Sequence, residues 1–256
     1  MNPITPPYFS VITTVRNRRQ TIERCITSVI RQKFSNFEYI IIDAMSDDGT
    51  SELVERFRLT DNRITYVREP DSGIYSALNK AIRLATGRYV CVVHSDDLLP
   101  DDLVLSHVYS RTNMECPDIY SGRAAYFRSE PSKIVREYPN VDLSLEKLCR
   151  GMMPNHTAMY INKSVFERVG LYSESFRIAG DFEFLFRFCS ACSPTVQADS
   201  KIISLMQTGG ASTGGIRSMI TLNREMIKIT RIYGFNLSIW KLLLKYLEKI
   251  SELRVL

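Results

Sequence analysis

The stretch ITYVREPDSGIYSALNKAIRLATGRYVCVVHSDD, residues 64–97, decides the predicted fold. Two short apolar runs, RITYV (63–67) and RYVCVV (88–93), have the composition of buried strands. Between them, residues 74–85 place apolar side chains at helical spacing, and Gly87 is expected to close that helix. Acidic residues follow both strands, at position 71 and at positions 96 and 97.

The residues upstream repeat this alternation. YFSVITTV (8–15) and FEYIIID (37–43) are predicted as strands, and helices are predicted over residues 18–32 and 46–58. Strands and helices in alternation, with almost no hairpin signals, predict an α/β fold with a mostly parallel central sheet and helices on both faces. The chain of 256 residues, 45% of them hydrophobic, is long enough to bury such a core.

The acidic residues after the strands are expected to meet, because right-handed crossovers bring the carboxyl ends of parallel strands to one edge. The four residues concerned are Asp43, Asp71, Asp96 and Asp97. Crowded carboxylates suit a hard divalent cation, which also binds the oxygens of a diphosphate. The alternative is that acidic residues cap a helix starting near residue 100; we favour capping for Asp101 and Asp102, and the metal for Asp96.

Charge and cysteine content narrow the class of protein. Thirty-three basic and 28 acidic residues give a net charge of +5, which suits an anionic ligand or a membrane surface but is too small for a nucleic-acid-binding protein. Six scattered cysteines are expected to be reduced, and the Cys189–Cys192 pair is interpreted as packing. With no secretory leader and no apolar run of 18 residues, the expected location is the cytoplasm.

Five blocks of sequence carry a family resemblance. In order, they are SVITTVRN, IIDAMSDDGT, EPDSGIYSALNKAI, ATGRYVCVVHSDD and PNHTAMYINKSVFERVGLYSESFRIAGDFEFLFR. Together they resemble family 2 glycosyltransferases, nucleotide-sugar transferases with the GT-A fold. The resemblance implies a GT-A domain over residues 1–212, with a nucleotide-sugar-binding half (1–115) and an acceptor half (116–212). The acceptor half is expected to contain an antiparallel ribbon, and residues 213–256 are expected to form a C-terminal helical extension.

The resemblance also implies which residues bind the donor. Contact with the nucleoside is implied for Thr13, Thr14, Val15 and Asn17, and contact with the base for Asp43. Contact along the donor is implied for Arg68, Asp71, Ser72 and Gly73. Strand packing remains an alternative for the two threonines, a turn cap for Asp43, and a helix start for Gly73.

The family's Asp-x-Asp metal motif is here His94-Ser95-Asp96, which departs from the pattern at its first position. The resemblance implies that Asp96 binds Mn²⁺ or Mg²⁺. His94 is then expected to contact ribose, or phosphate through a water molecule, and a structural role remains its alternative.

Inverting sugar transfer needs a general base for the acceptor hydroxyl. In IAGDFEFLFRF (178–188) the apolar residues form one helical face, and Asp181 at the helix start matches the family's catalytic acidic residue. The alternative is that Asp181 is the N-cap. Glu183 is a weaker candidate base, and His156 is either near the donor sugar or structural. The GGAS run (209–212) is either a closing loop or a plain turn.

The C-terminal residues 236–256 combine apolar residues at helical spacing with lysines. They are expected to contact a membrane surface, to pack on the catalytic domain, or to contact a second subunit in a homo-oligomer.

The expected function is transfer of one sugar from a UDP-sugar to a glycan acceptor on a polyprenyl diphosphate, on the cytoplasmic face of the inner membrane. Such transfer builds bacterial surface polysaccharides of the O-antigen type. A sugar nucleotidyltransferase is disfavoured because the turn TTVRNRR has no phosphate-binding glycine. A non-catalytic nucleotide-sugar-binding protein would not need Asp181.

Overall fold

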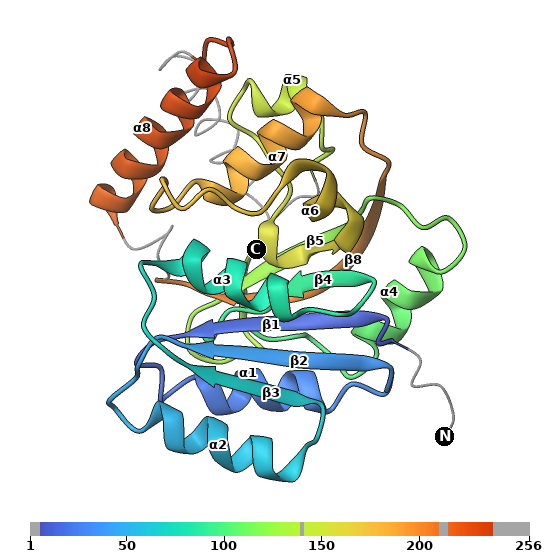
Figure 1. The fold of residues 1–256 in the computed structure, drawn as a ribbon, viewed down its shortest axis with the longest axis vertical. Helices are drawn as coiled ribbons and strands as arrows, with labels where there is room; N and C mark the ends of the chain where they lie inside the picture. Colours follow the sequence, from blue (N-terminus) through green and yellow to red (C-terminus); the bar gives the residue numbers. More distant parts are fainter. Residues whose placement is uncertain (1–5, 139–140, 210–214, 238–256) are drawn as a thin grey trace.

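The computed structural model describes residues 6–138, 141–209 and 215–237. One half of its central sheet is parallel (Figure 1). This half consists of β3 (Ile64–Arg68), β2 (Phe37–Asp43), β1 (Phe9–Val15) and β4 (Tyr89–Val92), in that order. The strands lie within a residue or two of their predicted positions, so the prediction of a parallel sheet is confirmed.

The other half of the sheet is mostly antiparallel. β7 (Met159–Asn162) pairs with β4, and β5 (Ile119–Phe127) pairs with both β7 and β6 (Ile134–Tyr138). β8 (Val196–Gln207) pairs in parallel with β5 and completes an eight-stranded sheet. The predicted ribbon is β5–β6, whereas β7 and β8 are not predicted from the sequence.

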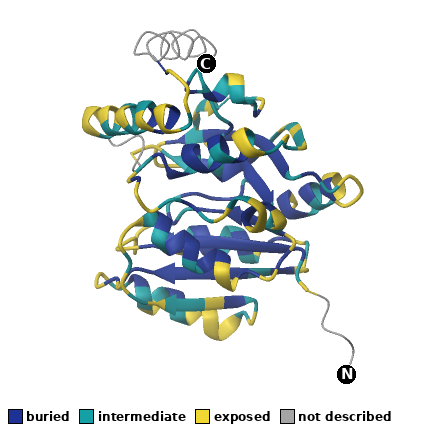
Figure 2. Cartoon of the chain, turned by 45° about the horizontal axis from the view of Figure 1, so that its top comes forward, coloured by how far each residue is buried: buried dark blue, intermediate teal, exposed yellow. Residues whose placement is uncertain are grey.

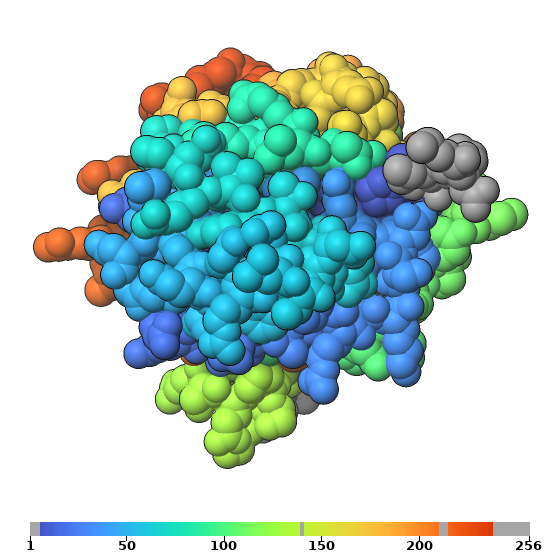
Figure 3. Space-filling model, turned by 60° about the horizontal axis from the view of Figure 1, so that its bottom comes forward, coloured from blue at the N-terminus to red at the C-terminus, as the bar shows by residue number. Residues whose placement is uncertain are grey.

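Helices cover both faces of the sheet, as predicted. α1 (Ile22–Ile30), α2 (Thr50–Thr60) and α4 (Val104–Thr112) share one apolar cluster with one side of the strands. α3 (Ile74–Leu84) packs in a second cluster on the opposite side. The burial view shows the strands enclosed between these layers (Figure 2). Residues of the first third of the chain form most of the face that carries α2 (Figure 3).

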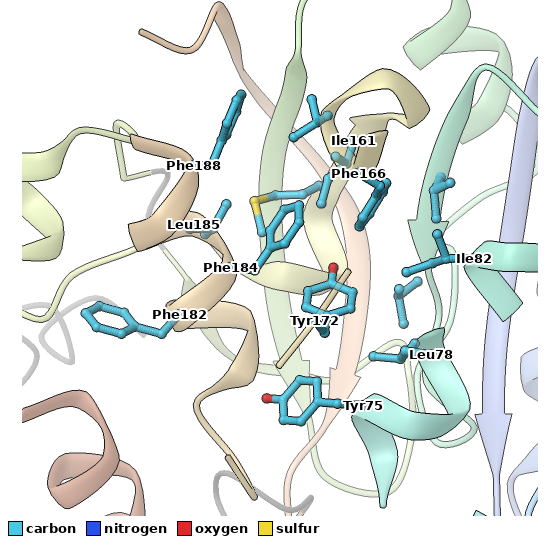
Figure 4. Packing of buried hydrophobic residues seen from close by; sticks show 14 of the residues in the cluster. Tyr75, Leu78, Ile82, Ile161, Phe166, Tyr172, Phe182, Phe184, Leu185 and Phe188 are labelled. Atoms are coloured by element: carbon cyan, nitrogen blue, oxygen red, sulfur yellow. The ribbon is translucent and has the colours of Figure 1, made fainter. Parts of the chain in front are cut away.

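Within the described residues, the other four α-helices pack on the side of the sheet that α3 covers. They are α5 (Leu145–Leu148), α6 (Lys163–Val169), α7 (Gly180–Ala191) and α8 (Ile216–Ile232). The short 3₁₀ turn η1 (His156–Ala158) precedes β7, and its Ala158 belongs to the cluster on the other side. In the cluster on the α3 side, Phe184 of α7 lies beside Tyr172, and Tyr172 in turn lies beside Tyr75 of α3 (Figure 4). Within the described ranges, no helix has the length and apolar character needed to cross a membrane.

Three local predictions need correction. Gly87 does not cap α3, because the helix ends at Leu84 and Ala85 is already extended. A Cβ atom at position 87 would lie 2.6 Å from the backbone nitrogen of Ser10, so the glycine permits a close approach to β1. The helix expected near residue 100 begins at Val104, and Asp102 pairs with Lys33 instead of capping it.

Candidate active site

A cavity of about 510 Å³ lies at the carboxyl-terminal edge of the parallel strands. Its wall combines the ends of β1 and β8, the turn after β4 and the first turns of α3 and α7. The structure brings together on this wall ten residues that the sequence analysis named as site candidates: Thr14, Val15, Asp71, Gly73, His94, Ser95, Asp96, Asp97, His156 and Asp181.

Asp71 and Gly73 lie in the turn that leads into α3. Gly73 immediately precedes the helix with a φ of +150°, a conformation that favours glycine, and its N–H donates to Asp71 Oδ1 at 3.1 Å. Ser72 Oγ donates to Glu174 Oε2 at 3.2 Å. This contact joins the turn to the segment that precedes α7.

The two consecutive aspartates in the turn after β4, Asp96 and Asp97, have different surroundings. The Asp97 N–H donates to the His94 carbonyl at 2.9 Å, and Asp96 lines the cavity. Asp97 is only 3% exposed, and its Oδ1 accepts a hydrogen bond from the Gln207 N–H of β8 at 3.2 Å. Burial, reinforced by the charge of Asp96, raises the pKa of Asp97 well above that of an ordinary aspartate. Asp97 therefore joins this turn to β8, while Asp96 is free to meet a ligand.

Asp181 lies in the first turn of α7, but Ala179 and not Asp181 is the N-cap residue. Its Oδ1 accepts hydrogen bonds from the Phe182 N–H at 2.8 Å and from the Tyr75 hydroxyl at 3.3 Å. Burial raises the pKa of Asp181, and these hydrogen bonds offset only part of the rise. A carboxylate with a raised pKa in a cavity is suited to accept a proton.

Gly180 allows Tyr75 to reach Asp181. A Cβ atom at position 180 would lie 2.7 Å from ring atoms of Tyr75. The single proton of the Tyr75 hydroxyl is shared between Asp181 Oδ1 and the nearer acceptor, the Ile178 carbonyl at 2.5 Å. The tyrosine thus holds the chain on both sides of the glycine.

Glu183, the weaker candidate base, is placed differently. It is 6% exposed, accepts from Arg187 Nε at 3.0 Å and from the Tyr233 hydroxyl at 2.6 Å, and is not among the described residues that line the cavity. Glu183 therefore joins α7 to the residue after α8.

Two imidazoles lie side by side in the cavity wall. The rings of His94 and His156 have centroids 6.2 Å apart, and His156 Nε2 is 2.8 Å from the Tyr172 hydroxyl. Burial lowers the pKa of both histidines to about 4, and for His94 the neighbouring His156 adds to the effect. Both rings are therefore neutral at neutral pH and offer hydrogen bonds instead of charge.

Asp43 is not among the described residues that line the cavity, and its implied contact with a base stays a prediction. It is fully buried, and its carboxylate accepts from the Ser46 N–H and from the hydroxyls of Ser46, Ser51 and Tyr66 at 2.6–2.8 Å. Burial acts to raise the pKa of Asp43, but these hydrogen bonds outweigh it and lower the pKa. The arrangement matches the alternative, a residue that holds a turn.

Asn17 and Arg68 hold the same turn and are likewise not among the described lining residues. Asn17 adopts a left-handed conformation, with φ of +53°, and its Oδ1 accepts from the Asp47 N–H at 3.0 Å. Arg68 Nη2 donates to the Ser46 carbonyl at 2.9 Å. Asp43, Asn17 and Arg68 thus all hold the loop after β2, and their implied contacts with the donor stay predictions.

The fit to a divalent cation depends on Asp96. In the described ranges, no three His, Cys, Asp or Glu side chains are grouped so that they could hold a metal ion. Mg²⁺ and similar ions are commonly bound by one or two carboxylates together with substrate phosphates and water. Asp96 on the cavity wall fits that mode, in which the ion binds together with a diphosphate.

Several lining residues were not singled out from the sequence. Arg16 and Arg18 flank Asn17 in the turn after β1, and their position after a predicted strand could have indicated them. Leu222 and Met226 are four residues apart on α8, so helical spacing places them on one side. Nothing local in the sequence indicates that this side faces the cavity.

The fold and the position of the cavity are typical of α/β enzymes, which as a class bind their ligands at the carboxyl edge of the parallel strands. The model of the family described as "Glycosyl transferase family 2" matches residues 10–174, which is more than half of the chain. The chain belongs to this family and is a glycosyltransferase.

Two relatives illustrate the similarity. The chain is 26% identical over 213 residues to a PGL/p-HBAD biosynthesis glycosyltransferase of Mycobacterium bovis, covering 80% of this chain and 79% of the relative. It is 36% identical over 117 residues to the putative teichuronic acid biosynthesis glycosyltransferase TuaG of Bacillus subtilis, covering 45% and 46% of the two chains.

Solved structures confirm the GT-A fold. The S. aureus TarS 1-349 complex with UDP-GlcNAc has a TM-score of 0.70 at 18% identity, covering 88% of this chain and 64% of that chain. The mannosyltransferase PcManGT from Pyrobaculum calidifontis, in complex with GDP-Man and Mn²⁺, has a TM-score of 0.66 at 18% identity, covering 90% and 65%. The chain thus spans a little under two thirds of these larger proteins.

Proposed function

We propose that this glycosyltransferase moves one sugar, with inversion, from a UDP-sugar to a growing glycan acceptor. The observation that carries the proposal is the presence of Asp96 and Asp181 on the wall of one cavity. Asp96 follows a strand at the edge where nucleotides bind in open α/β sheets, and Asp181 has the raised pKa of a general base.

The donor diphosphate is proposed to lie between the turn after β4 and the start of α3. Asp71 and Gly73 lie at the amino end of α3, where the helix dipole favours a negative group. The exposed side chains of Arg16 and Arg18 add positive charge beside it. Asp96 would hold Mn²⁺ or Mg²⁺, which when bound neutralises negative charge on the leaving diphosphate.

The proposed reaction is a single displacement. The acceptor hydroxyl oxygen forms a bond to the anomeric carbon as the bond from that carbon to the diphosphate oxygen breaks. The Asp181 carboxylate takes the hydroxyl proton, and the nucleoside diphosphate leaves with the bonding electrons. Inversion at the anomeric carbon follows because one nucleophile replaces one leaving group on the opposite side.

The acceptor is proposed to be a surface glycan on a polyprenyl-diphosphate carrier, bound at the cytoplasmic face of the inner membrane. The names of the relatives, which refer to PGL/p-HBAD and teichuronic acid biosynthesis, support a cell-envelope acceptor. α8 supports membrane contact because it exposes Ile216, Ile220 and Ile232 next to basic residues such as Arg224. The expected contact through residues 236–256 lies outside the described residues apart from 236 and 237.

Incubation with radiolabelled nucleotide sugars tests the function. The protein is mixed with each donor and a lipid-linked glycan acceptor, with Mn²⁺ or with a chelator. We expect label in the lipid fraction with a UDP-sugar and Mn²⁺, and none with chelator. Donor binding without transfer to any acceptor or to water would contradict catalysis, and equal transfer with chelator would contradict the metal.

A further inference from the structure

The chain that delivers Asp181 to the cavity is held by a carboxylate from a distant helix. Glu225 of α8 accepts three backbone hydrogen bonds from the residues just before α7. Its Oε1 accepts from the Arg177 N–H at 2.8 Å, and its Oε2 accepts from the Ile178 and Ala179 N–H groups, both at 2.9 Å. One side chain thus binds three consecutive peptide groups, the last of them at the N-cap of α7.

The same peptide segment is held from its other side by α3. The Tyr75 hydroxyl donates its single proton mainly to the Ile178 carbonyl at 2.5 Å, and Asp181 Oδ1, at 3.3 Å, shares that proton as a second, longer acceptor. The Ile178 residue is therefore fixed through its N–H by Glu225 and through its carbonyl by Tyr75. The position of Asp181, three residues further along, depends on both contacts.

α8 is well placed to act in this way. Leu222 and Met226, on the turns beside Glu225, line the cavity, and Met226 and Ile229 are buried in the cluster that contains Phe182. A carboxylate is also favoured next to the amino end of a helix, because the helix dipole attracts negative charge. Among the described residues, Glu225 is the side chain that accepts from these three amides.

We propose that Glu225 is a positioning residue that sets the place of Asp181 in the cavity, a role that rests on the proposed function of Asp181 as general base. α8 is then part of the catalytic apparatus, although it contributes no reacting group. Small displacements of a catalytic group are costly, since a shift of about 1 Å can reduce a rate by about 100-fold.

Glu225→Gln is the most informative change. The glutamine amide has only one oxygen that can accept hydrogen bonds. Its NH₂ group would face backbone N–H groups that, in the wild type, donate to the second carboxylate oxygen of Glu225. We expect kcat to fall by about 10- to 100-fold, while the dissociation constant of the nucleotide-sugar donor changes little. Glu225→Asp keeps the carboxylate on a shorter side chain and should recover part of the lost kcat.

The matched control is Glu167→Gln, the same chemical change at an exposed position of α6. It should leave kcat unchanged. Hydrogen exchange of the amides at 177–179 supplies a readout that does not require turnover. Exchange should be slow in the wild type and in Glu167→Gln, and faster in Glu225→Gln.

The pH profile separates positioning from a general loss of folding. Burial raises the pKa of Asp181, so a loosened segment that admits water should move the acid limb of kcat to lower pH in Glu225→Gln. Unchanged exchange at 177–179, or unchanged kcat and pH profile despite faster exchange, would overturn the proposal. A wild-type protein that turns over no nucleotide sugar would instead overturn the proposed function, while the exchange result would still decide whether Glu225 holds the segment.

Discussion

Replacing Asp181 with asparagine removes a proton acceptor while preserving the shape of the side chain. In the wild type, Oδ1 accepts from the Phe182 N–H and from the Tyr75 hydroxyl. The asparagine carbonyl oxygen can accept both of these hydrogen bonds. The substitution should therefore leave α7 and the cavity in place and remove only the ability to take a proton from the acceptor.

The expected loss of catalytic rate follows from the removal of this proton acceptor. General base catalysis contributes about 10²- to 10⁴-fold in rate, which corresponds to about 3 to 5 kcal/mol in activation free energy. The stability of the folded protein, in contrast to the rate, should not decrease. Because the folded-state pKa of Asp181 is raised, its ionised form costs stability at pH values above that pKa, and the neutral asparagine removes this cost. Tm at neutral pH should be unchanged or higher.

The assay compares kcat, donor affinity and Tm for Asp181→Asn and for Glu183→Gln. Glu183 is bound to Arg187 and Tyr233, so its substitution should lower Tm with a smaller effect on turnover per folded molecule. The wild-type acid limb of kcat/KM should lie above the ordinary aspartate pKa and vanish in Asp181→Asn. A variant that keeps more than about a tenth of wild-type kcat would refute the general-base role, given the about 10²-fold minimum expected.

The remaining predictions concern the other parts of the cavity. Asp96→Ala should abolish the Mn²⁺-dependent increase in Tm that UDP causes in the wild type. At a UDP concentration of 100 times Kd, that increase corresponds to a stabilisation of about 2.7 kcal/mol. Equal increases in Tm for the variant and the wild type would contradict metal binding by Asp96. Gly180→Ala should cost about 1 to 3 kcal/mol in denaturant unfolding and lower kcat, because its Cβ would strike the Tyr75 ring; a stable, fully active variant would show that the ring has room to move. In the folded protein the pKa of His94 and of His156 is lowered to about 4. As pH falls below 6.5, these histidines therefore take up protons in the unfolded chain before they do so in the folded protein. The free energy of unfolding should consequently decrease from pH 6.5 towards pH 4. Replacing both histidines with glutamine should flatten that part of the Tm profile, and an unaltered profile would contradict the shifts.

The parallel half of the fold could be predicted because its signals are local. Each of the four strands is a short apolar run, and the helices after β1 and β3 each have a clear apolar face, so local patterns indicate the order. The antiparallel half gives weaker signals. β8 mixes polar and apolar residues, and its register with β5 shifts twice, between Ser121 and Arg123 and between Arg123 and Ala124. β7 has only four residues.

The candidate site shows the same difference between features that depend on local sequence and features that depend on long-range contacts. Sequence position after a strand was enough to bring Asp71 and Asp96 to one cavity. It could not indicate that Asp43, the last residue of β2, is enclosed by Ser46, Ser51 and Tyr66. That outcome depends on where three hydroxyl groups lie in space. The contacts of Glu225 are equally long-range, because they join residues on α8 to the segment before α7.

A crystal structure with UDP and Mn²⁺ tests most directly whether this cavity holds the donor. We expect the metal ion to be bound by an oxygen of Asp96 at about 2.1 Å, a distance typical of a small hard cation, with the diphosphate next to Asp71 and the amino end of α3. The carboxylate of Asp181 should remain unliganded and open to the acceptor. A diphosphate bound elsewhere on the protein, or a metal ion that does not contact Asp96, would contradict the account.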